Sequence, residues 1–387
     1  LRTGKDCTVN GLWGSSASFF IAALASEQLK TTKARPRILL VVPSIEEAEE
    51  DVEDLKTFLD GHAELFPAGE NIFTNNYENE GEVLAQRLHI LNQLLYGDIH
   101  DGSKFDIIVT PIPALLQPVP SPKSITKNIM SLQRNHEYPR EELVSWLQKH
   151  HYQLTSQVEN FGEYALRGGI VDIFPYASNV PYRIEYFGDE IESIRRFNIE
   201  SQQSERELDC CQILSVDKMY ETNALQSEHG KTSLLSYLNK NIWIVLKEPA
   251  SIEDRARKIL TDANTSGVLF TYDEISSQFN TFVKISLEKL PLSLNTNDYT
   301  FHVKSADNFP HNIQAIASEF NTVIEAHTRT LVFCNNVAEE QRFQEIIHDL
   351  HIEIKVPVQP PPLTPPTRGG GKTFPPPVPL TEGEKGG

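Results

Sequence analysis

The stretch Arg37-Ile-Leu-Leu-Val-Val-Pro43 is an unbroken apolar run closed by proline, and Phe105-Asp-Ile-Ile-Val-Thr-Pro111 repeats the pattern further along the chain. Continuous apolar runs of this length are typical of parallel strands that are buried on both faces. Between them, residues 45–59 and 81–95 carry apolar side chains at helical spacing. Alternation of strands and helices predicts an α/β domain built on a parallel sheet.

The helix expected over residues 45–59 carries a dense run of carboxylates. We expect this run to form the solvent-facing side of the helix, with Ile45, Ala48, Val52 and Leu55 on the buried side. The run consists of Glu46, Glu47, Glu49, Glu50, Asp51, Glu53 and Asp54.

From about residue 140 the pattern changes to one helix, predicted over 140–149, followed by short strands over 169–174, 182–187 and 190–197. This pattern predicts a small α+β unit inserted into the α/β domain. The two-residue period of a strand places Arg183, Glu185 and Phe187 on one face. An aromatic side chain beside a forked cation is a favourable interface composition. Composition alone, however, favours a solvated face with Phe187 in the core.

After this unit, strand and helix patterns alternate again over residues 234–286, with strands expected over 242–246 and 267–270 and a helix over 251–260. A further α/β unit begins with helices expected over 312–320 and 338–350 and a strand over 329–334. Ten of the 24 prolines fall in residues 357–387. That composition predicts an extended, disordered tail or linker without a core.

One glycine-containing segment imitates a phosphate-binding loop between an expected strand and a helix. In a P-loop, backbone amides surround the phosphates, a lysine reaches the terminal phosphates and a hydroxyl holds magnesium. Ala17 occupies the lysine position, which removes the cation that phosphoryl transfer needs. Ser18 keeps the hydroxyl, but a simple glycine turn that leads into a helix is the favoured interpretation. The segment is Gly11, Leu12, Trp13, Gly14, Ser15, Ser16, Ala17 and Ser18.

Composition excludes several classes of protein. The 387 residues contain 35 Lys+Arg and 53 Asp+Glu, a formal net charge of −18, which disfavours non-specific nucleic-acid binding because that binding needs clustered cations. The four cysteines have neither disulfide nor metal-site spacing, so no metal site is predicted. No apolar stretch reaches the roughly 20 residues that a membrane span needs. We therefore expect a cytoplasmic protein that does not bind membranes.

Two blocks of the inserted unit resemble a family. They are Gly162-Glu-Tyr-Ala-Leu-Arg-Gly-Gly-Ile-Val-Asp-Ile-Phe-Pro175 and Pro181-Tyr-Arg-Ile-Glu-Tyr-Phe-Gly-Asp-Glu-Ile-Glu-Ser-Ile-Arg195, continued by Phe197 and residues 201–204. The blocks are similar to a region shared by UvrB and the bacterial transcription-repair coupling factors, and a weaker similarity extends from the decayed loop to about residue 350. Two features favour the coupling factors over UvrB. Ala17 replaces the lysine that a working UvrB needs, and residues 66–80 form a short connection where UvrB has a long tyrosine-rich hairpin.

The resemblance implies a module of nucleotide excision repair that docks onto UvrA and brings repair proteins to stalled RNA polymerase. The family's contact residues correspond to Arg167, Arg183 and Phe187, which reverses the interpretation based on composition. RNA polymerase and DNA would be bound only by downstream domains of the full-length family. Its ATP-driven translocase motor is also downstream, so we expect no enzymatic activity, no catalytic residues and no cofactor in this chain.

The expected organisation has five parts. Residues 1–126 are the first part of a degenerate RecA-like domain of the P-loop NTPase type, 127–216 the inserted UvrA-binding domain, and 217–307 the remainder of the UvrB-like module. Residues 308–356 begin a further α/β domain, and 357–387 form the tail. The tail departs from the family's pattern where a complete third domain would continue, which leaves open a whole natural product, a fragment or a truncated gene model. The alternative function is a UvrB-type ATP-dependent excision subunit, and direct binding of damaged DNA is disfavoured by the charge and the short connection.

Overall fold

The computed structural model describes residues 6–29, 38–69, 81–97, 105–215, 226–227, 230–262, 268–290, 298–303 and 337–349. The chain divides into two units, of which the first comprises residues 1–308 and 332–335 and the second residues 309–331 and 336–387. In the second unit the described part is helix α11 (Val337–Asp349). The helix and strand expected over 312–320 and 329–334, and the tail over 357–387, lie outside the described residues.

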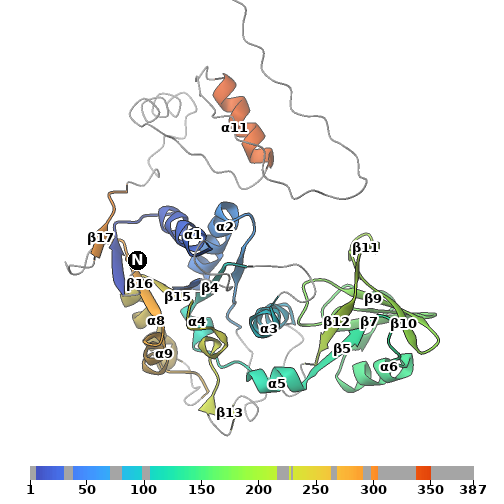
Figure 1. Cartoon of the computed structure of the whole chain (residues 1–387). Helices are drawn as coiled ribbons and strands as arrows, with labels where there is room; N and C mark the ends of the chain where they lie inside the picture. The colour runs from blue at the N-terminus through green and yellow to red at the C-terminus, as the bar shows by residue number, and fades with distance from the viewer. Residues whose placement is uncertain are drawn as a thin grey trace, which may run out of the picture. The chain divides into compact units, whose positions relative to one another are not determined.

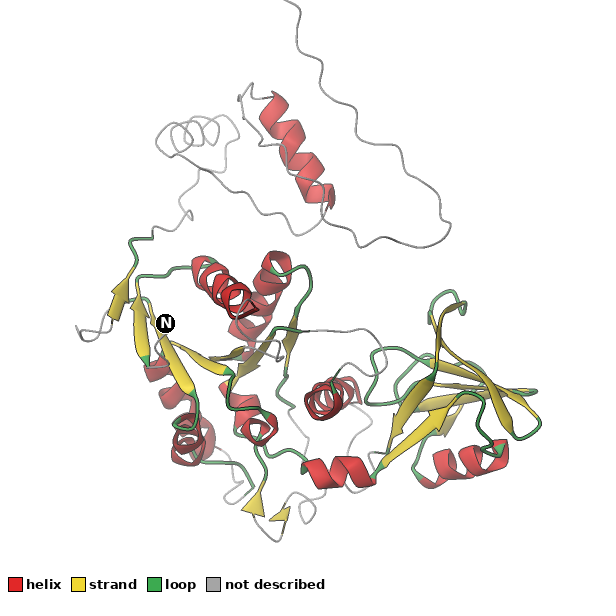
Figure 2. Cartoon of the chain, in the orientation of Figure 1, coloured by secondary structure: helices red, strands yellow, loops and turns green. Residues whose placement is uncertain are grey.

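The first unit contains a parallel sheet of seven strands (Figures 1 and 2). Its spatial order is β17 (Asp298–Thr300), β1 (Cys7–Asn10), β16 (Val283–Glu288), β15 (Trp243–Lys247), β2 (Ile38–Val42), β4 (Ile107–Pro111) and β3 (Ala63–Leu65). Every neighbouring pair is parallel. The expected α/β class is therefore confirmed.

Both faces of this sheet are covered, which explains why its strands are continuous apolar runs. Along β2, Ile38 and Leu40 pack into one core, while Leu39 and Val41 pack into the other. Helices α1 (Ser16–Leu29) and α2 (Ile45–Phe58) cover one face, and α8 (Pro249–Asp262) and α9 (Tyr272–Phe279) cover the opposite face (Figure 1). The remaining described elements here are α3 (Gly81–Tyr96), α4 (Ile112–Leu115), β13 (Gln226–Ser227), β14 (Gly230–Lys231) and the 3-10 helix η2 (Leu234–Tyr237).

One strand expected from the sequence is wrong. Residues 268–270 are not a strand; the Phe270 amide instead donates to the Leu116 carbonyl at 2.8 Å, and its ring is buried. The strand in this part of the chain is β16, whose alternation of half-buried and buried side chains gives a weaker apolar signal. The short apolar run that suggested a strand is therefore a loop, and its Phe270 side chain packs into the core.

The second sheet of the first unit has six strands in the order β11 (Ser204–Leu208), β10 (Glu190–Phe197), β9 (Tyr182–Phe187), β8 (Ile170–Ile173), β7 (Glu163–Arg167) and β6 (Gln153–Leu154). A two-stranded sheet, β5 (Ile129–Gln133) with β12 (Cys210–Leu214), helix α6 (Arg140–Lys149) and helix α5 (Pro122–Lys127) complete this region (Figure 2). The expected strands of the meander are confirmed, whereas β5, β6, β7, β11 and β12 were not foreseen. The five domain limits drawn from the sequence stay predictions.

The two faces of the six-stranded sheet bury apolar clusters of very different size. On one face, Val171, Ile184 and Ile194 pack against α6 through Leu143 and Leu147. On the other face, a small cluster of Val158, Ala165, Phe174 and Phe197 is packed by Phe161 and Ile199. Outside this small cluster, that face carries polar side chains together with Ile170 and Phe187.

Candidate partner-binding surface

The glycine-containing loop has the shape of a strand-to-helix turn. It follows β1 directly, with Gly11 at φ +80° and Gly14 at φ +53°, and α1 begins at Ser16. The Trp13 amide donates to the Ser16 hydroxyl, which donates back to the Trp13 carbonyl. The Ala17 side chain is buried. Gly11 to Ser18 therefore form a turn that is closed by its own hydrogen bonds, and their assignment as a degenerate nucleotide loop stays a prediction.

The hydroxyl that a P-loop directs at magnesium is used internally. Ser18 is fully buried and its Oγ donates to Asp51 Oδ1 at 2.9 Å. The same carboxylate accepts from Lys247 Nζ at 2.9 and 2.8 Å. The expectation that Asp51 faces solvent is wrong: Lys247, at the end of β15, draws this one carboxylate into the interior, since a buried charge needs a partner.

A cavity of about 150 Å³ lies beside this turn. Its lining residues include four glutamates, Glu47, Glu50, Glu248 and Glu288, and two lysines, Lys247 and Lys289. Because Lys247 is already bound to Asp51, the charge around the cavity is unfavourable for a phosphate.

The segment that follows β17 packs against the glycine-containing loop. The Phe301 amide donates to the Asn10 carbonyl at 2.8 Å, and the Phe301 ring meets the Phe20 ring edge to face. A Cβ at Gly11 would lie 2.0 Å from the Phe301 carbonyl oxygen. Gly11 is therefore required for the close approach of this segment, independently of any phosphate.

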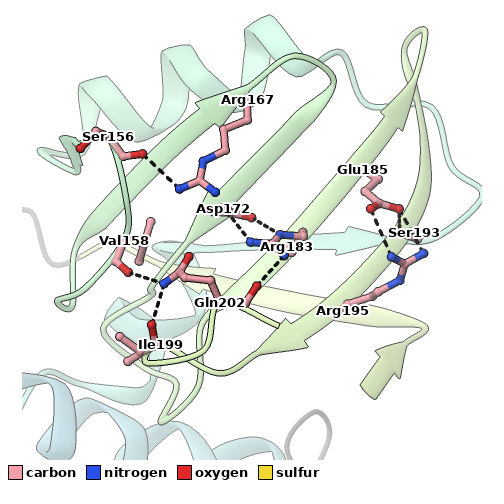
Figure 3. A network of polar contacts seen from close by, with 10 residues as sticks. All are labelled: Ser156, Val158, Arg167, Asp172, Arg183, Glu185, Ser193, Arg195, Ile199 and Gln202. Carbon is pink, nitrogen blue, oxygen red and sulfur yellow. Dashed lines mark hydrogen bonds and ion pairs between the residues drawn. The ribbon is translucent and has the colours of Figure 1, made fainter. Parts of the chain in front are cut away.

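The second group of predicted residues lies on the polar face of the six-stranded sheet (Figure 3). Strand pairing sets Arg183 opposite Asp172, and Ile170 opposite both Glu185 and Arg167. Directly paired residues point to the same face of a sheet. Arg167, Arg183 and Phe187 therefore share one face, as the alternation within β9 predicted for Arg183 and Phe187.

Arg183 is bound within the chain. Its Nε and Nη2 donate to the two carboxylate oxygens of Asp172 at 2.7 and 2.9 Å, and its Nη1 donates to the Gln202 carbonyl at 3.1 Å (Figure 3). The guanidinium also lies over the Phe197 ring. The hydrogen bonds to Asp172 raise the pKa of Arg183, and Asp172 itself is buried. This pair is a fixed element of the face.

A second polar group lies next to this pair. Glu185 accepts from the Ser193 hydroxyl at 2.6 Å and forms an ion pair with Arg195 at 3.1 Å (Figure 3). Ser193 is buried, whereas Arg195 is partly exposed. The alternation within β9 indicates Glu185, but no sequence pattern indicates Ser193 or Arg195 as members of this group. A register shift in β10 between Ile191 and Ser193 sets their position, and no pattern in β10 alone reveals it.

Phe187 and Arg167 lie where β9 and β7 end. Phe187 is 78% exposed, so the alternative that places it in the core is wrong. Arg167 is exposed and donates to the Ser156 carbonyl at 3.2 Å. Because β7 and β9 are both antiparallel to β8, they run in the same direction and end at the same side of the sheet. At roughly 5 Å between strands and 3.3 Å per residue, the two positions are roughly 12 Å apart.

Two tight turns follow these residues. Arg167 pairs with Ile170 around Gly168-Gly169, and Phe187 pairs with Glu190 around Gly188-Asp189. Gly168 and Gly188 have φ of +62° and +64°, as the first position of a type II′ hairpin requires. We call the surface formed by Arg167, Phe187 and these two turns the hairpin tips.

Within the described ranges, no group of three or more histidine, cysteine or carboxylate side chains is arranged to hold a metal ion. In the same part of the chain, none of the helices combines the length and the apolar character needed to cross a bilayer. Among the described residues, Cys7, Cys210 and Cys211 form no disulfide bond. Cys334 lies outside the described residues.

The region that carries the hairpin tips matches a known family. Residues 130–230 match the family model described as the UvrB interaction domain. The chain is 33% identical over 201 residues, 52% of its length, to the transcription-repair-coupling factor of Bacillus subtilis (strain 168). It is 24% identical over 214 residues, 55% of its length, to the protein of the same name from Escherichia coli (strain K12). These similarities confirm the resemblance predicted from the sequence.

A third relative is the transcription-repair-coupling factor of Haemophilus influenzae, which is 30% identical over 150 residues, or 39% of this chain. The matches span 16%, 18% and 13% of the lengths of the three relatives. The chain therefore corresponds to a small part of each.

Proposed function

We propose that this chain carries the UvrA-docking surface of a transcription-repair coupling factor and takes part in recruiting nucleotide excision repair proteins to stalled RNA polymerase. The observation that carries the proposal is an aromatic side chain, Phe187, held 78% exposed at a strand end within the region that matches the UvrB interaction domain. Exposed aromatic residues beside arginines are typical of the centres of protein interfaces.

The chemistry of the surface defines the partner site. Phe187 would fill an apolar pocket on UvrA, and the exposed guanidinium of Arg167 would meet an acidic group there. Arg183 would contribute to UvrA binding in two ways. Its pair with Asp172 makes the surface rigid, and the guanidinium N–H groups that do not bind Asp172 can donate hydrogen bonds to UvrA. RNA polymerase and DNA would be bound by other parts of a full-length coupling factor.

Calorimetric titration of the chain with purified UvrA tests this proposal. We expect the parent to bind, and we expect Arg183→Ala, Phe187→Ala to abolish binding. Tyr299→Ala is the matched control, because Tyr299 is also an exposed aromatic residue but lies in β17, outside the matched region. Equal binding by the double variant and the parent would contradict the assignment of this surface.

We further propose that the α/β sheet acts as a framework without catalytic activity or cofactor. Three observations support this proposal. Ala17 stands at the lysine position, the Ser18 hydroxyl donates its hydrogen bond to Asp51, and four glutamates line the cavity beside the turn. The alternative, a UvrB-type ATP-dependent excision subunit, requires nucleotide binding. Titration with ATP and an ATPase assay distinguish the two, since micromolar binding or turnover would favour the excision subunit.

A further inference from the structure

The two hairpin tips are held by one short segment that lies outside both hairpins. We call residues 135–140, which lead into α6, the bracing segment. The Tyr138 amide donates to the Asp189 carbonyl at 2.9 Å, within the turn that follows Phe187. Two further backbone bonds, from Asn135 to the Ile191 carbonyl at 2.8 Å and from Ile191 to the His136 carbonyl at 3.1 Å, fix the start of β10 to the same segment.

The other turn is held by a side chain from the end of this segment. Arg140 Nη1 donates to the carbonyl of Gly168, the residue that follows Arg167. In a two-residue hairpin the carbonyl of the first turn residue takes no part in the ladder between the strands. This carbonyl is therefore available to a donor from α6, and Arg140 is that donor.

The position of Arg140 is unfavourable for the helix itself. It is the first residue of α6, where the helix dipole disfavours a cation. Glu141 and Glu142 in the same turn offset this effect, and Arg140 lies 3.4 Å from Glu141. An arginine at this position is explained by its contact with the turn, because lysine, glutamate or alanine would serve a helix start at least as well.

The Gly168-Gly169 turn also contacts the end of β9, next to Phe187. The Tyr186 amide donates to the Gly169 carbonyl at 2.9 Å, and a Cβ at Gly169 would lie 3.1 Å from the Tyr186 carbonyl oxygen. Leu143 and Leu147 bury α6 under the opposite face of the sheet, so Arg140 reaches the turn from the side away from Arg167 and Phe187. It can fix the turn without being part of the docking face.

We propose that the bracing segment presets the spacing of Arg167 and Phe187, and that Arg140 is a positioning residue for Arg167. The inference rests on the proposed function, since it concerns the same docking surface. A partner that binds two anchors on separate turns gains affinity when their spacing is fixed before binding, because no order has to be imposed during association.

A double-mutant cycle tests the inference in the whole chain with UvrA as the titrant. We expect Arg140→Ala to weaken binding about five- to tenfold, and Arg140→Lys to recover most of the loss because it retains a cationic donor. In the Arg167→Ala background, Arg140→Ala should change the affinity less than about twofold, since its effect acts through Arg167. Arg134→Ala is the control: Arg134 has a similar exposure, and its ion pair with Glu207 lies on β11.

Hydrogen exchange supplies a readout that does not depend on UvrA. Arg140→Ala should lower the protection of the Tyr186 amide, which bonds to Gly169, while Arg134→Ala leaves it unchanged. Additive losses in the cycle, or unchanged protection of Tyr186, would overturn the inference. Failure of the parent chain to bind UvrA would instead reject the proposed function, and the exchange measurement would still decide whether Arg140 holds the turn.

Discussion

Two ion pairs, one beside the seven-stranded sheet and one on the six-stranded sheet, use the same chemistry for different ends. Lys247 binds Asp51 beside the glycine-containing loop, and Arg183 binds Asp172 on the polar face of the six-stranded sheet. In both pairs the carboxylate is buried. The first pair lies beneath a closed turn, whereas the second lies on a face that also carries an exposed aromatic residue. A buried ion pair by itself thus says little about function, and what surrounds it decides whether it supports a core or a binding surface.

We expect the largest effect when the Lys247–Asp51 ion pair beside the seven-stranded sheet is broken. Lys247→Met leaves Asp51 as a buried carboxylate without its cation, and we expect the free energy of unfolding to fall by about 3–5 kcal/mol. Urea denaturation followed by circular dichroism measures this change. Lys258→Met is the control, because Lys258 and its partner Asp254 are both 63% exposed; its effect should stay below about 1 kcal/mol. Equal stability of the two variants would contradict an essential role for the Lys247 pair.

The next effect concerns the hairpin tips, where we expect a substitution to weaken binding and leave the stability nearly unchanged. Phe187→Ala should weaken UvrA binding by about 2–4 kcal/mol, as truncation of a central aromatic anchor does. The free energy of unfolding should change by less than about 0.5 kcal/mol, since the ring is mostly exposed. Titration calorimetry and urea denaturation of the same variant test both statements. A loss of stability that matches the loss of affinity would show that Phe187 packs within the chain.

Arg183 is expected to lie between these two cases. Arg183→Ala should lower the free energy of unfolding by about 2–3 kcal/mol, because Asp172 loses its hydrogen-bond donors while remaining buried. Adding Asp172→Ala removes the unpaired carboxylate and should recover part of this stability. Recovery of UvrA affinity in that double variant would identify Arg183 as a support for the surface, whereas persistent loss would identify it as a contact. Paired denaturation and titration experiments separate the two.

The smallest effect concerns the capping box of α9. Burial opposes ionisation of Glu274, but hydrogen bonds from Thr271 and the nearby Lys231 lower its pKa below the ordinary 4.5. A lowered folded-state pKa means that the ionised group stabilises the fold above pH 4.5, and that this contribution is lost as the pH falls through the folded-state pKa.

Glu274→Gln should therefore reduce the free energy of unfolding at pH 7 by about 0.5 kcal/mol, a small value because the side chain is 46% exposed. The difference should vanish in acid, which denaturation at several pH values measures. UvrA binding should be unchanged, since α9 belongs to the framework. A difference that persists or grows in acid would contradict the role given to the carboxylate.

Much of the fold was readable from local patterns. The apolar runs that became β2 and β4 predicted a buried parallel sheet, because a strand covered on both faces needs apolar side chains at every position. The alternation in β9 predicted that Arg183 and Phe187 share a face. The expected strand over 267–270 was wrong because a short apolar run fills a core equally well from a loop.

The sequence by itself determined the buried strands β2 and β4, the face of β9 and the alanine at position 17, since propensity, period and residue identity are local properties. Only the tertiary structure decided which carboxylate of the acidic run is buried, because Lys247 lies 196 residues from Asp51 along the chain. It also decided that Arg183 binds Asp172, that Phe187 faces outward and that Arg140 reaches Gly168. These outcomes depend on which distant groups meet in space, and a linear pattern does not contain that information.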